Sequence, residues 1–108
     1  MSGEAAERVL FRLIADAEAL LARAAVLHEG ADAAIAEVRA EAAELRGTVE
    51  VAALELAEHS AVGYLADAAA SIELLVRAIQ AGDPVRAEEN REQAEYYLRA
   101  AEQSMEAG

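Results

Sequence analysis

Apolar residues in the middle of the chain recur at alternating spacings of three and four. The series comprises Ile35, Val38, Ala42, Leu45, Val49, Ala52 and Leu56. This spacing puts one apolar stripe on a single helix face, which is typical of a helix packed in a bundle. The next inward position is His59, so we expect a polar ring at a core register.

Similar stripes and turn residues predict three more helices. The first helix is expected at about 3–29, with Gly30 as a left-handed cap and Asp32 as the cap of the next helix. Gly82, Asp83 and Pro84 match a helix end, an N-cap and a first-turn proline. The inward residues expected on the flanking helices are Leu10, Leu13, Ala17, Leu20, Ala24 and Leu27, followed after His59 by Val62, Leu65, Ala69, Ile72, Val76 and Ile79.

The boundary between the second and third helices has two candidate positions. Gly47-Thr48 resembles the other turns, but a break there gives helices too unequal to pair along their lengths. The stripe changes phase after His59, so we place the turn near 57–61, with Ser60 as the N-cap. The predicted helices are then 3–29, 32–58, 60–81 and 83–106, and they predict one all-α domain over 1–108, an up-down antiparallel four-helix bundle.

Composition narrows the classes of function. The formal charge is −12 and every cation is an arginine, which argues against nucleic-acid binding and against an anionic membrane. The chain lacks cysteine, a signal-peptide pattern and an apolar run long enough to span a bilayer. We therefore expect a soluble cytoplasmic protein, a monomer rather than a dimer, whose partner is a small-molecule ligand.

Four alanines are expected at one height of the bundle, one from each helix: Ala17, Ala42, Ala69 and Ala94. Larger residues lie about one turn above and below them. Small side chains between larger ones either let the helices approach closely or leave a hole, and an empty hole costs about 2 to 5 kcal/mol per leucine-to-alanine equivalent. Both outcomes, close packing or a ligand cavity, are open at this stage.

The inward register of the last helix contains a polar residue, either Asn90 or Arg91, just above this alanine level. An amide or guanidinium buried there requires a partner, such as a ligand carbonyl or carboxylate. The alternative is that Arg91 extends along its own stem to solvent. Tyr97 is a further candidate for the wall of such a site.

His59 and Gly63 are separated by one helical turn if one helix includes both. This spacing puts an imidazole, the one candidate metal ligand, beside a position where a flat ring could approach the backbone, which suits a porphyrin. The predicted surrounding residues are Ala52, Ala66, Ala101 and Met105, with Glu55 or Ser60 orienting the second ring nitrogen.

The hairpin sequence Ala78-Ile79-Gln80-Ala81-Gly82-Asp83-Pro84, the interior Gly63 and the inward His59 resemble de novo designed four-helix bundles that hold porphyrins or drug-like molecules. The resemblance implies a planar, largely apolar ligand between the helices. It implies heme or a synthetic metalloporphyrin on His59, with artificial heme-dependent catalysis, or a metal-free ligand near Asn90 and Arg91. The competing interpretation is a purely structural or self-associating bundle.

Overall fold

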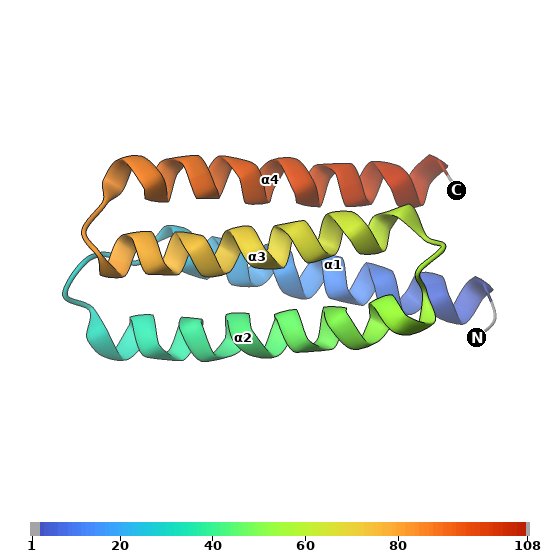
Figure 1. Cartoon of the computed structure of the whole chain (residues 1–108), viewed down its shortest axis with the longest axis horizontal. Coiled ribbons are helices and arrows are strands. Elements are labelled where there is room, and N and C mark those ends of the chain that lie inside the picture. The colour runs from blue at the N-terminus through green and yellow to red at the C-terminus, as the bar shows by residue number, and fades with distance from the viewer. Residues whose placement is uncertain (1–2, 108) are drawn as a thin grey trace.

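The computed structural model describes residues 3–107 and contains four helices: α1 (Gly3–Ala25), α2 (Asp32–Glu55), α3 (Ser60–Gln80) and α4 (Pro84–Ala107) (Figure 1). Successive helices run in opposite directions, and together they form a rod of 45 × 21 × 18 Å. The predicted all-α four-helix bundle is confirmed.

The core forms because the predicted stripes face inward. Within residues 3–107, Ser71 is the one buried polar residue, and the rest of the core is aliphatic. The α3 helix contacts the other three helices, whereas α2 and α4 do not touch within the described residues. The bundle is therefore a rhombus in section, with α1 and α3 meeting across its short diagonal.

The closest helix pair is α3 with α4. Small side chains permit this approach because they let two backbones come near each other without leaving voids. The small residues buried on α3 outside its main seam are Ala61, Ala68, Ser71 and Ala78.

The α1 helix ends at Ala25, before the predicted end at 29. The Leu27 amide bonds to the Ala24 carbonyl, a tight i→i+3 turn that closes the helix. Leu27 then lies half-buried against the core. Gly30, with φ of 95°, belongs to a second turn closed by the Ala31 amide and the His28 carbonyl, so it does not cap α1.

The α2 helix continues through Gly47, and the chain turns between Glu55 and Ser60, which overlaps the region 57–61 that the phase change indicated. The N-cap position of α3 is His59 rather than Ser60, and it makes no side-chain capping bond. Asp32 likewise lies inside the first turn of α2, where its carboxylate favours the helix dipole.

The turn between α3 and α4 has the expected chemistry. Gly82, with φ of 70°, donates to the Ile79 carbonyl, and the Asp83 amide donates to Ala78, which together form a Schellman motif. Asp83 then caps α4, since its Oδ1 accepts from the Arg86 amide at 3.1 Å.

Candidate functional site

The four alanines of the predicted level are all buried, with 1% or less of each side chain exposed. Of the five hollows described for residues 3–107, none is lined by any of Ala17, Ala42, Ala69 and Ala94. The short α1–α3 diagonal agrees with this observation, because it draws two of the four helices together at the centre. Of the two outcomes left open by the sequence, this geometry favours close packing.

The structure divides the predicted porphyrin site into buried and exposed residues. Ala52 and Ala101 are buried in the core, Met105 is half-buried, and Gly63 and Ala66 are exposed on α3. A Cβ built on Gly63 meets no atom within 4 Å, so this glycine lies in open space rather than beside a pocket.

His59 does line a hollow, but a small one. Its volume is about 220 Å³, below the roughly 300 to 1,000 Å³ of pockets that hold drug-sized ligands. Ser60 and Ser104 lie in the same hollow and share a hydrogen bond between their hydroxyls. These residues do not fit a porphyrin as they stand, and heme ligation by His59 stays a prediction from the sequence.

The two candidate polar residues of α4, Asn90 and Arg91, both have hydrogen-bond partners inside the chain. The Asn90 side-chain amide donates to the Arg86 carbonyl at 2.9 Å. Arg91 forms a fork with Glu88 on one side and bonds to Glu95 at 2.6 Å on the other. These bonds raise the pKa of the Arg91 guanidinium and lower the pKa of the Glu88 carboxyl. Neighbouring turns of α4 therefore supply the partners of Asn90 and Arg91, in place of a ligand.

Tyr97 lies half-buried against the core and packs edge to face on Tyr96, with ring centroids 5.5 Å apart. Tyr96 is exposed. The pair covers the flank of α4 and does not line any of the five hollows of residues 3–107.

A larger hollow opens at the end of the bundle where the 26–31 loop meets the α3–α4 turn. We call it the loop-end hollow, and its volume is about 420 Å³. Its apolar wall comes from the end of α1, the last turns of α3 and the first turns of α4. The lining residues are Ala25, Leu27, His28, Glu29, Leu75, Ile79, Gly82, Asp83, Pro84, Ala87, Glu88 and Arg91.

The hollow exists because α4 has no large apolar side chain at this height. Its inward positions are Ala87 and Arg91, and Val85 points to solvent with 67% of its side chain exposed. Leu75 is buried and Ile79 is half-buried on the opposite wall. A gap is therefore left between α3 and the start of α4.

The rim of the loop-end hollow is charged. Three carboxylates, those of Glu29, Asp83 and Glu88, are present against the single guanidinium of Arg91. The Glu29 carboxylate leans over Gly82, where a Cβ would come within 2.7 Å of its oxygen. This rim disfavours an anionic ligand, since the one cation on it is already paired.

A second feature that the sequence analysis did not find is the carboxyl pair Glu18 and Glu102, which face each other between α1 and α4. A shared hydrogen bond, then burial and mutual repulsion raise the pKa of Glu18 to about 7. Spacing within either helix gives no sign of this pair, because it depends on how the two helices are rotated against each other. Arg91 differs, because its i−3 and i+4 glutamates are visible in the sequence.

No protein-family model matches the chain, and neither the curated proteins nor the solved structures that were searched contain a significant match. Among residues 3–107 no helix combines the length and the apolar character needed to cross a membrane. The same part of the chain holds no group of three or more histidine, aspartate or glutamate side chains arranged to bind a metal.

Proposed function

We propose that the chain binds a neutral, largely apolar, planar organic molecule in the loop-end hollow. The observation that carries the proposal is the gap beside Ala87, which leaves the half-buried Leu27 and Ile79 accessible at the one end of α4 that lacks a large inward residue. Its volume lies within the range of small-molecule pockets. Arg91 belongs to the metal-free site expected from the sequence.

The charge of the hollow defines the class of ligand. Three rim carboxylates repel an anion, and Arg91 already bonds to Glu88 and Glu95. A neutral molecule avoids the desolvation of a charge and gains from burying its apolar surface against Leu75 and Ile79. The remaining N–H groups of Arg91 then donate hydrogen bonds to a carbonyl or ether oxygen of the ligand.

The proposal includes a designed origin for the chain. It is supported by the regular heptads and by the Schellman turn with its Asp83 cap, which are common elements of designed helical hairpins.

A titration with Nile red, a neutral planar dye, tests the binding. We expect one dye per chain, with blue-shifted emission. Ala87→Leu is expected to fill part of the gap, weaken dye binding at least tenfold and raise the thermal midpoint. The matched control is Ala70→Leu on the exposed face of α3, which leaves dye affinity unchanged. Equal affinity in the wild type and Ala87→Leu contradicts the proposal.

A further inference from the structure

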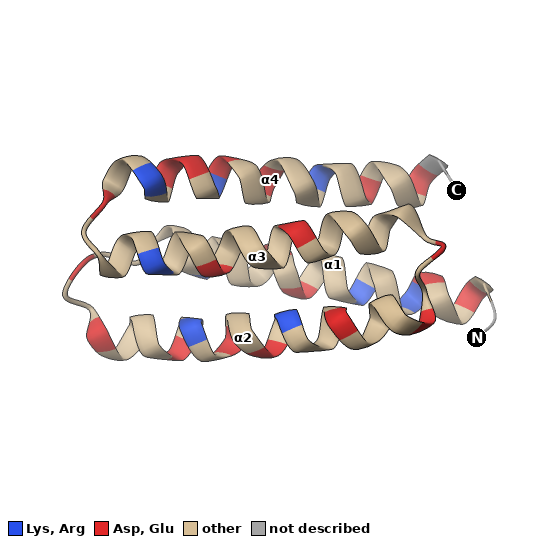
Figure 2. Cartoon of the chain, viewed as in Figure 1, with Lys and Arg blue, Asp and Glu red and all other residues tan. Residues whose placement is uncertain are grey.

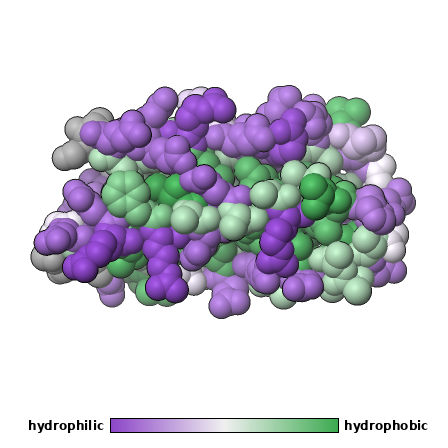
Figure 3. Space-filling view, turned by 180° about the vertical axis from the view of Figure 1, so that it is seen from behind, coloured by the Kyte–Doolittle hydropathy of each residue, from purple (hydrophilic) through white to green (hydrophobic). Residues whose placement is uncertain are grey.

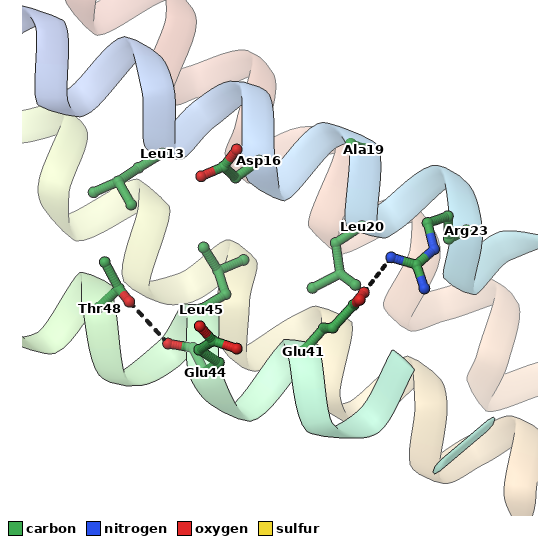
Figure 4. Close-up of a pocket in the computed structure, with 9 residues that line it drawn as sticks. All are labelled: Leu13, Asp16, Ala19, Leu20, Arg23, Glu41, Glu44, Leu45 and Thr48. Carbon is green, nitrogen blue, oxygen red and sulfur yellow. Dashed lines mark hydrogen bonds and ion pairs between the residues drawn. The ribbon is translucent and has the colours of Figure 1, made fainter. Parts of the chain in front are cut away.

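A groove runs between α1 and α2, on the opposite side of the molecule from α4. Its floor consists of the core residues Leu13, Leu20 and Leu45, and its volume is about 290 Å³ (Figure 4). It forms because α1 and α2 pack less closely than α3 and α4 do. These leucines are 5% to 8% exposed, so only their edges face the groove along the middle of α1.

Apolar surface continues from this groove over the back of α1. Figure 3 shows a pale to green belt across the rear face of the molecule, bordered by hydrophilic residues. The exposed apolar residues that recur at helical spacing on α1 are Phe11, Ala15, Ala19 and Ala22, and Val26 follows directly after the helix. Phe11 and Val26 are 52% and 77% exposed, so the belt includes large side chains as well as alanines.

The rim of the groove is acidic. Asp16, Glu41 and Glu44 line it against one cation, Arg23. Arg23 is already paired with Glu41 and lies 3.4 Å from Glu37. Among residues 3–107, Asp16 and Glu44 have no ion-pair partner, and Figure 4 shows their carboxylates on opposite sides of the gap.

The rest of the molecule has the same sign of charge. Acidic side chains outnumber basic ones along α2 and α4 (Figure 2), and the chain carries −12 overall. A second copy would bring another acidic rim to the groove and be repelled. A partner with positive charge beside its apolar surface matches the groove and is attracted from a distance.

We propose that the α1–α2 groove is a docking site for a cationic amphipathic helix. An elongated groove with an apolar floor accepts the apolar side chains that such a helix presents at i, i+3, i+4 and i+7. Lysine or arginine side chains flanking that stripe meet Asp16 on one wall and Glu44 on the other, and Ala19 leaves room for the partner's backbone. The helix then packs as a fifth member of the bundle.

The test uses a synthetic helical peptide of leucine and lysine, with leucines at helical spacing, and a matched peptide in which glutamate replaces lysine. Binding is followed by isothermal titration calorimetry at 0.15 M salt. We expect the leucine–lysine peptide to bind one per chain and the leucine–glutamate peptide not to bind. Ala19→Gln should weaken the first peptide at least tenfold, and Glu44→Gln about threefold or more.

Two variants on the exposed face of α3 separate docking from general attraction to an acidic protein. Ala70→Gln and Asp67→Asn make matching changes outside the groove, and we expect less than a twofold effect from either. Equal losses in Asp67→Asn and Glu44→Gln, or binding of both peptides alike, overturn the proposal. The absence of binding by the leucine–lysine peptide also overturns it. A concentration-dependent dimer that Ala19→Gln abolishes does so too, because it would assign the groove to a second copy of the chain. Circular dichroism checks that each variant is folded.

Discussion

At the residue scale, two glycines show how differently the same residue is used. Gly82 has a positive φ and lies under the Glu29 carboxylate in the Schellman turn. Gly63 lies inside α3 with helical geometry, and an added Cβ would have open space around it. The first position requires glycine, whereas the second merely tolerates it.

We therefore expect opposite effects from one substitution. Gly82→Ala should lower the free energy of unfolding by about 1 kcal/mol or more, because alanine is strained at this φ and meets Glu29. Gly63→Ala should raise it by about 0.5 to 1 kcal/mol, because alanine favours the helix. Urea unfolding measures both. A loss of stability in Gly63→Ala would show that an occupant or a neighbour fills the space beside this glycine.

Glu18 gives stability a dependence on pH. Its pKa is raised from the ordinary 4.5 to about 7 by the bond to Glu102, so the folded state holds this proton more tightly than the unfolded state. The stabilisation that this proton adds to the free energy of unfolding is fully present below about pH 4.5. It declines as the pH rises to about 7 and is absent above that pH. Glu18 is exposed and Glu102 is half-buried, so solvent screening keeps the size of this contribution below about 1 kcal/mol.

The measurement compares the unfolding free energy of the wild type and Glu18→Gln from pH 4.5 to 8. The difference between the two proteins cancels the opposite pH dependence that Glu88 contributes, because Arg91 lowers the pKa of Glu88 equally in both. We expect the wild type to lose stability relative to Glu18→Gln across this range. A difference that does not vary with pH would show that the two carboxyls do not share a proton.

At the element scale, the inward stripes predicted from the sequence agree with the observed core, because burial of one face fixes how each helix is rotated. The stripe of α2 does not determine the position of His59. The helix ends at Glu55, so the heptad register no longer applies there, and His59 becomes the half-buried N-cap of α3. The sequence leaves either a ligand or solvent as the partner of Arg91, whereas in the structure glutamates on its own helix satisfy it.

Alanine packing between helices makes a further prediction. Ala69 on α3 is 1% exposed, at the level where α3 and α1 meet across the short diagonal. We expect Ala69→Leu to destabilise the protein by about 1 to 3 kcal/mol, because extra methyl groups overpack a closed layer. Thermal unfolding measures this effect, with Ala87→Leu as the comparison, for which we expect a gain in stability. A gain in Ala69→Leu would instead reveal a vacant space at the alanine level.

At the scale of the whole molecule, the sequence predicts four helices and their order, but not where space is left between them. The spacing of the alanines allows a cavity at their level, yet none of the five hollows described for residues 3–107 is lined by these alanines. The loop-end hollow depends on three separate segments: the early end of α1, the α3 wall and the short side chain of Ala87. Sequence periodicity describes one helix at a time, and it cannot show what three segments leave between them.

The central claim is that a neutral apolar molecule binds at the loop end and not between the alanines. Methyl NMR spectra recorded with and without Nile red test it most directly. We expect shifts at the methyl groups of Leu27, Leu75, Ile79 and Ala87, and no change at those of Ala17, Ala42, Ala69 and Ala94. Shifts confined to the four alanines would contradict it.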